Sequence, residues 1–130
     1  MIDKDALHIL LADDDSDARA LLAAILKSCG YRHFEHAADG QQAFELLRRE
    51  ADQIGLAFLD IDMPGYTGIE VMLLAKSVRP GCACVIVSAH SMVDNVLAAL
   101  RAGACGFVVK PYSPNKIVDV LAKFEREATA

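Results

Sequence analysis

Short apolar runs alternate along the chain with longer segments in which apolar residues recur every three or four positions. Continuous apolar runs predict buried strands, and the longer spacing predicts amphipathic helices. The expected strands are residues 8–12, 31–38, 56–60, 82–87 and 107–109. A helix is expected after each strand, at about residues 18–29, 39–47, 69–78, 91–100 and 113–124.

Residues that commonly begin or end a helix support this assignment. Asp39 is followed three residues later by Gln42, and Thr67 by Glu70, which is the spacing of a capping box. Gly30 can end the first helix because glycine accepts the left-handed backbone that often follows a helix. The apolar residues expected on one face of the fourth helix are Val93, Val96, Leu97 and Leu100.

Strand and helix alternate five times without a linker or an internal repeat. This pattern predicts an α/β fold, a parallel sheet with helices on both faces, in a single domain over residues 1–130 with its core at about 8–124. Phe34 lies between polar residues, so the second strand is expected at an edge of the sheet. The order that follows is 2-1-3-4-5, the flavodoxin-like order, in which the first and third strands are neighbours where the crossovers change direction.

Composition and charge argue against several kinds of partner. The hydrophobic share of 54% is too high for a disordered chain. Thirteen basic against 18 acidic residues give a net charge of −5, which disfavours direct binding to nucleic acid. The first residues lack the features of a signal peptide, and no apolar run reaches membrane-spanning length. A cytoplasmic protein without a membrane partner is therefore expected.

The cysteines are expected to be buried free thiols. None belongs to a C-x-x-C pair, and three lie in or beside predicted strands. A disulfide or a zinc site is therefore disfavoured. The four cysteines are Cys29, Cys82, Cys84 and Cys105.

Acidic residues follow two strands that are expected to be neighbours. The run Leu56–Leu59 ends at Asp60, and the first strand is followed by Asp13 and Asp14. Three carboxylates in one crevice repel each other unless a cation neutralises them, and oxygen donors favour a hard ion such as Mg²⁺. For Asp13 and Asp14 alone, helix capping is an equally good interpretation. The addition of Asp60 favours the metal site.

Two further polar residues follow strands at the same expected edge. Lys110 precedes Pro111, and an X-Pro bond at a tight bend can be cis and aim the lysine inward. The alternative is an ordinary solvated lysine. Ser88 alone is more often a capping or loop hydroxyl. The histidines show no metal-ligand spacing, and no catalytic role is assigned to His8, His33, His36 or His90.

Together these motifs resemble a known family. The acids Asp13-Asp14, Asp60 in L-D-I-D-M-P-G, Ser88-Ala89 and Lys110-Pro111 are similar in order and spacing to the receiver domain of two-component response regulators, in particular to single-domain, chemotaxis-regulator-like receivers. The resemblance covers the chain from about His8 to about Phe124.

The resemblance implies a phosphorelay function. Asp60 would be the phosphoacceptor, taking a phosphoryl group from a phosphohistidine on a histidine kinase or a histidine phosphotransfer protein. Ser88 would be the switch hydroxyl, and Lys110 the amine that pairs with the phosphate. The chain would then catalyse only its own phosphorylation and dephosphorylation, and would not otherwise be an enzyme.

The resemblance also implies a metal site and an output surface. Mg²⁺ would be held by Asp14 and Asp60, by Asp13 through water, and by the backbone carbonyl of Asp62. Phe107 would be the switch aromatic, here without the hydroxyl of the tyrosine that is common in the family. A downstream protein would bind the face of the fourth helix, fifth strand and fifth helix.

Two other functions are weaker interpretations of the same residues. Asp60-Ile61-Asp62 resembles the D-x-D motif of haloacid-dehalogenase-type aspartyl phosphatases, but there the motif ends the first strand, and here an acid pair precedes it. A phosphorylation-independent scaffold is disfavoured because all the site residues are present. The sequence does not distinguish a free-standing regulator from a phosphorelay intermediate or from the receiver of a longer protein.

Overall fold

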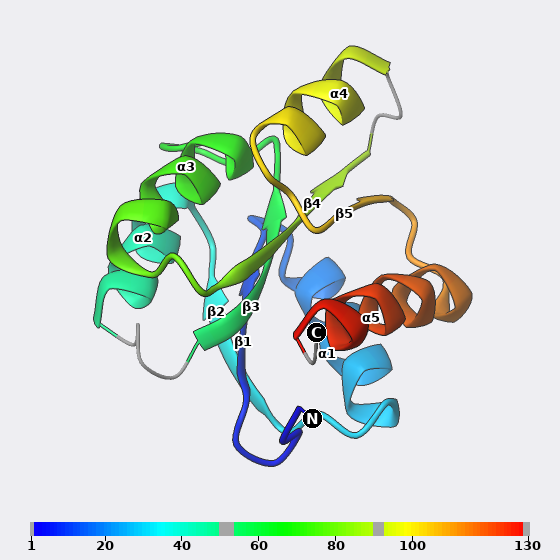
Figure 1. The fold of residues 1–130 in the computed structure, drawn as a ribbon. Helices are drawn as coiled ribbons and strands as arrows, with labels where there is room; N and C mark the ends of the chain where they lie inside the picture. The colour runs from blue at the N-terminus through cyan, green and yellow to red at the C-terminus, as the bar shows by residue number, and fades with distance from the viewer. Residues whose placement is uncertain (1, 50–53, 90–92, 129–130) are drawn as a thin grey trace.

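The computed structural model describes residues 2–49, 54–89 and 93–128, and strands and helices alternate through them as predicted (Figure 1). The strands are β1 (His8–Ala12), β2 (His33–Ala37), β3 (Ile54–Asp60), β4 (Ala83–Ser88) and β5 (Gly106–Val109). The helices are α1 (Ser16–Ser28), α2 (Gly40–Arg49), α3 (Gly68–Val78), α4 (Val93–Arg101) and α5 (Pro114–Ala128).

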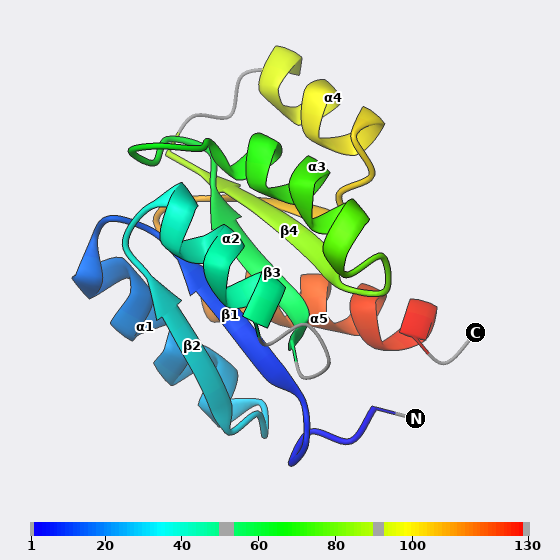
Figure 2. The same ribbon diagram turned by 90° about the vertical axis from the view of Figure 1, so that its left-hand side faces the viewer.

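The strands form one parallel sheet in the order β2-β1-β3-β4-β5, so the predicted order is confirmed. Helices α1 and α5 cover one face, and α2, α3 and α4 cover the other (Figures 1 and 2). The polar strand β2 lies at the edge, as Phe34 and its polar neighbours predicted.

Each face of the sheet carries its own apolar layer. Along β3, Leu56 and Phe58 pack with α1 and α5, whereas Ala57 and Leu59 pack with α2 and α3. Successive strand residues point to opposite faces, so a strand covered on both sides needs an unbroken apolar run. This requirement explains why β3 stays apolar until Asp60.

The helix ends follow the predicted local chemistry. The Glu70 backbone N–H donates to Thr67 Oγ1 at 3.2 Å and the Thr67 N–H donates to Glu70 Oε1 at 3.0 Å, which completes a capping box. The Gln42 N–H donates to Asp39 Oδ1 at 2.8 Å. Gly30 follows α1 with φ of 100°, in the left-handed region that favours glycine.

Helix α4 buries a small residue against the rest of the protein and leaves two of its leucines largely exposed. Among the residues of α4 whose burial is described, Ala99 is the buried one, while Leu97 is 40% exposed and Leu100 is 47% exposed. A small residue at the contact lets a helix lie close to its neighbours, so the leucines on either side of Ala99 remain at the surface. The expected helix start at 91–92 lies outside the described residues.

All four cysteines are free thiols; Cys84 and Cys105 are buried as expected, whereas Cys29 and Cys82 are only partly buried. Among the described residues, no helix combines the length and the apolar character needed to cross a membrane.

Candidate functional site

The candidate site lies where the strands end. Asp13 directly follows β1, Asp60 ends β3, Ser88 ends β4 and Lys110 directly follows β5. In the strand register Ala12 is paired with Leu59, and Asp60 with Val87. Because all strands are parallel, these ends meet at one edge of the sheet, which is where α/β folds bind ligands.

Lys110 joins two of the carboxylates. Its Nζ lies 2.6 Å from Asp13 Oδ2 and 2.7 Å from Asp60 Oδ2. The Lys110–Pro111 peptide bond is cis, and the Lys110 N–H donates to the Ser88 carbonyl at 2.8 Å. Asp13 is 3% exposed and Asp60 is 5% exposed, so the ion pairs are largely shielded from water.

Loop amides hold the other carboxylate oxygens. The Asp15 N–H donates to Asp13 Oδ1 at 2.9 Å, and the Asp62 N–H donates to Asp60 Oδ1 at 2.9 Å. Each carboxylate is thus oriented by the loop that follows its own strand. The side chain of Asp15 also caps α1 by accepting from the Asp17 and Ala18 amides, so it serves the helix and not the cluster.

Asp14 completes a cluster of three carboxylates. Ligand oxygens from Asp13, Asp14 and Asp60 all lie within 4.8 Å of one another, and Asp14 is on the exposed side. Lys110 supplies one positive charge against these three carboxylates. Asp13 Oδ2 is buried and accepts no well-aligned hydrogen bond from the described residues, although Lys110 is at ion-pair distance. An all-oxygen set with this excess negative charge suits a hard divalent cation.

The electrostatics of the site reflect burial and pairing together. Burial raises the pKa of Asp60, and the hydrogen bonds from Lys110 and the Asp62 amide offset only part of that rise. Burial also disfavours the charged form of Lys110, but its contacts with Asp13 and Asp60 outweigh burial and raise the pKa of Lys110. The amine therefore remains positively charged at neutral pH.

The other predicted residues occupy different positions around this cluster. Ser88 is fully buried at the end of β4. Phe107 is half-buried and packs against the apolar layer beneath α2, α3 and α4. The Asp62 side chain is exposed, and Asp62 contacts the site through its backbone N–H. His90 lies outside the described residues.

Two residues that support the site were not recognised in the sequence. The Arg19 guanidinium donates to the Asp13 carbonyl through Nη1 and to His36 Nδ1 at 3.2 Å through Nε, which ties the loop after β1 to β2. A Cβ on Gly68 would lie 2.5 Å from the Asp60 carbonyl oxygen. The position of Gly68 within the T-G-I-E capping sequence was a local signal for its supporting role. No local signal indicated the contacts of Arg19.

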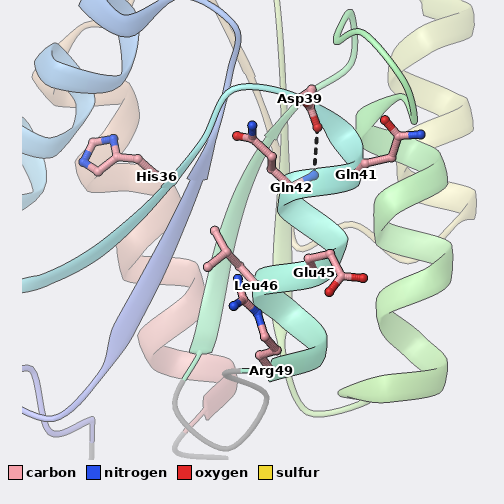
Figure 3. Close-up of a pocket in the computed structure, with 7 residues that line it drawn as sticks. All are labelled: His36, Asp39, Gln41, Gln42, Glu45, Leu46 and Arg49. Atoms are coloured by element: carbon pink, nitrogen blue, oxygen red, sulfur yellow. Dashed lines mark hydrogen bonds between the residues drawn. The ribbon is translucent and has the colours of Figure 1, made fainter.

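A hollow lies elsewhere, along α2 and the end of β2 (Figure 3). Its volume is about 450 Å³, and two of its lining residues, Asp39 and Gln42, are joined by a hydrogen bond. The described residues form no group of three metal-ligating side chains there. The carboxylate cluster is therefore the better candidate site. The hollow is lined by His36, Asp39, Gln41, Gln42, Glu45, Leu46 and Arg49.

Known proteins are similar to this chain in sequence and in fold. The family model described as response regulator receiver domain matches residues 9–122. The chain is 30% identical over 119 residues to the chemotaxis protein CheY of Thermotoga maritima, covering 92% of this chain and 98% of that protein.

Solved structures agree with the family match. A CheY-like response regulator receiver domain protein from Methanospirillum hungatei is 28% identical, with a TM-score of 0.82 over 95% of this chain and 98% of its own. A chain in the CheX–CheY–BeF3–Mg²⁺ complex from Borrelia burgdorferi is 27% identical, with a TM-score of 0.83 over 88% of this chain and 86% of its own.

The same domain occurs in proteins of different length. Three other curated relatives are matched over only 23%, 24% and 16% of their own length, whereas the Thermotoga maritima protein is matched over 98%. The family match spans most of the chain, and the site residues lie within the matched range. The chain therefore belongs to the response regulator receiver domain family, the signalling module of two-component systems.

Proposed function

We propose that Asp60 accepts a phosphoryl group from a phosphohistidine on a histidine kinase or a histidine phosphotransfer protein. The observation that supports this most is the ion pair between Lys110 Nζ and Asp60 Oδ2, at 2.7 Å, within the carboxylate cluster. Asp60 is the acid at the end of the central strand β3, the buried hydroxyl of Ser88 ends the neighbouring strand β4, and the Lys110 amine follows β5, the next strand along.

In the proposed reaction a carboxylate oxygen of Asp60 attacks phosphorus. The bond between phosphorus and the histidine nitrogen breaks, and the imidazole keeps the electron pair. Phosphoryl transfer depends mainly on positioning and on neutralising the phosphoryl oxygens. Lys110 is close enough to exchange its contact with Asp60 for one with a phosphoryl oxygen, and Ser88 would donate its hydroxyl to another.

The carboxylate cluster would hold Mg²⁺ in this reaction. The residues that fit are Asp14 and Asp60 as direct ligands, Asp13 through water, and the backbone carbonyl of Asp62. When bound, Mg²⁺ would neutralise charge on the carboxylates and on the phosphoryl oxygens. Its binding would also relieve the repulsion among the three acids.

Phosphorylation would change a surface on one side of the molecule. Ser88 would turn toward the phosphate, and Phe107 would move into the space that Ser88 vacates. Helix α4 contacts β5, which carries Phe107, and presents the exposed side chains of Leu97 and Leu100. We therefore place the binding site for a downstream protein on α4, β5 and α5, with these leucines as apolar contacts.

The chain would act as a switch that takes up one phosphoryl group, and not as an enzyme that turns over a substrate. We propose further that residues 1–130 act as one receiver domain in the cytoplasm, where the four free cysteines would stay reduced. The test is incubation with acetyl phosphate and Mg²⁺, followed by intact mass. One labile phosphoryl group per chain is expected, whereas repeated turnover of a small phosphomonoester would favour the phosphatase alternative.

A further inference from the structure

We propose that Cys82 and Cys84 form a peroxide-sensitive dithiol, in which Cys82 reacts first and Cys84 then closes a disulfide with it. The pair lies at the opposite end of the strands from the carboxylate cluster. Cys84 is paired with Ala57 in the strand register, and Val87 with Asp60, so three residues, about 10 Å of strand, separate the two regions. The proposal is therefore independent of phosphorylation.

The backbone brings the two thiols together. Cys82 directly precedes β4 and Cys84 is its second residue, and residues two apart in a strand point to the same face. Both side chains pack against the apolar layer beneath α2, α3 and α4. The Cys84 thiol donates to the Cys82 carbonyl oxygen at 3.9 Å, so its sulfur lies next to Cys82.

Cys82 is the member of the pair that solvent can reach. It is only partly buried and lines a cavity of about 320 Å³, whereas Cys84 is buried behind it and does not line the cavity. The neighbouring Cys84 thiol and the positive charge of Arg79 lower the pKa of Cys82 despite its burial. The proximity of Cys82 and burial raise the pKa of Cys84. The thiolate is the reactive form of cysteine, so Cys82 is the nucleophile of the pair.

Cys105 provides a natural comparison within the same cavity. It also lines the cavity, but its Sγ lies 3.6 Å from Glu127 Oε2. Burial and the negative charge of Glu127 raise the pKa of Cys105, so this thiol stays protonated. Cys105 is therefore an unreactive thiol against which the reactivity of Cys82 can be compared.

The chemistry balances with a hydroperoxide as the oxidant. The Cys82 thiolate attacks one peroxide oxygen, the O–O bond breaks, and hydroxide leaves, so that Cys82 becomes a sulfenic acid. The sulfur of Cys84 then attacks the Cys82 sulfur. The S–O bond breaks and water leaves, carrying the Cys84 proton. The product is a disulfide, and the chain has lost two hydrogens relative to the dithiol.

The test treats the reduced full chain with hydrogen peroxide and follows intact mass and peptide masses. The peptide that contains both cysteines should lose two hydrogens, and dithiothreitol should restore it. In Cys84→Ser, dimedone should trap a sulfenic acid at Cys82, with trapping at least about tenfold faster than at Cys105. Cys105→Ser and Cys29→Ser should leave the loss of two hydrogens unchanged, and circular dichroism should confirm that each variant is folded.

Four results would overturn the proposal. The first is a loss of two hydrogens in Cys82→Ser at the wild-type rate. The second is dimedone trapping in Cys84→Ser that is no faster at Cys82 than at Cys105. The third is a wild-type chain that reacts only at Cys29 or only between chains. Folded wild-type protein that keeps both thiols under peroxide would also contradict it.

Discussion

Lys110 Nζ lies 2.7 Å from Asp60 Oδ2, and this contact joins the end of the last strand to the end of the central one. The same nitrogen lies 2.6 Å from Asp13 Oδ2. One amine thus holds two buried carboxylates that would otherwise repel each other. Asp60, the proposed acceptor, is therefore already paired with the Lys110 amine, which we expect to contact the phosphate.

Replacing the acceptor should abolish phosphorylation. In Asp60→Asn the side chain keeps its size but loses the nucleophilic carboxylate, so acetyl phosphate with Mg²⁺ should add no phosphoryl group by intact mass. Asp39→Asn is the matched control, because Asp39 caps α2 outside the cluster and its variant should be phosphorylated normally. An adduct of unchanged yield in Asp60→Asn would disprove the assignment.

Mg²⁺ should raise the melting temperature of the unphosphorylated protein. Binding to the folded state alone stabilises it by about 1–3 kcal/mol at metal concentrations well above Kd. Asp14→Ala should remove most of this gain, because Asp14 is the exposed acid of the cluster. Asp17→Ala, also near the start of α1, should keep the gain. Differential scanning fluorimetry measures both, and an equal Mg²⁺ response in Asp14→Ala would mean that the ion binds elsewhere.

Removing the amine should destabilise the protein in a pH-dependent way. Lys110→Met takes away a group that lowers the pKa of Asp60, so the already raised folded pKa of Asp60 should rise further. A carboxyl whose folded pKa exceeds its unfolded pKa costs stability when ionised. The loss should therefore be largest at neutral pH, up to about 3 kcal/mol, and should shrink as the pH falls through the folded pKa.

Urea unfolding of the wild type and Lys110→Met without Mg²⁺, from neutral to acidic pH, measures this loss. Lys116→Met in α5 is a surface control that should unfold like the wild type at each pH. A loss in Lys110→Met that does not change with pH would show that packing, and not charge compensation, is the main contribution of Lys110.

Close packing at Gly68 should be essential for the site. A Cβ there would lie 2.5 Å from the Asp60 carbonyl oxygen and 2.9 Å from that of Leu59. Backbone must move to admit it, so Gly68→Ala should cost about 1–3 kcal/mol and slow phosphorylation by acetyl phosphate. At Gly81 a Cβ would meet nothing within 4 Å, so Gly81→Ala should change stability by no more than about 0.5 kcal/mol. Equal unfolding midpoints for the two variants would contradict this account.

A hydroxyl on Phe107 should sharpen the proposed switch. A tyrosine could hydrogen-bond at the surface and favour the outward state before phosphorylation. Such a bond is worth about 1 kcal/mol, or roughly fivefold in the population ratio. Hydrogen exchange of α4 and β5 should therefore differ more between the two phosphorylation states in Phe107→Tyr than in the wild type. Phe44→Tyr, a half-buried phenylalanine on α2, is the control. Equal differences in all three proteins would argue against a switch role for Phe107.

The sequence by itself determined the elements and their order. Strands and helices follow a periodicity that is read over a few residues, and the Thr67–Glu70 capping box involves partners three residues apart. The polar edge strand and the acids at strand ends then predicted the sheet order and the position of the site. These features depend on local pattern and on the geometry common to parallel sheets.

Only the tertiary structure decided which side chains touch across elements. Asp60 and Lys110 are 50 residues apart in sequence, and Arg19 reaches the carbonyl of Asp13 and the ring of His36 on another strand. The exposure of Leu97 and Leu100 likewise depends on α4 packing through Ala99, and local periodicity alone did not indicate that choice. Such contacts arise from the packing of whole elements. These contacts depend on how far side chains reach, on where the helices lie and on which residues fill the buried volume. No short stretch of sequence contains that information.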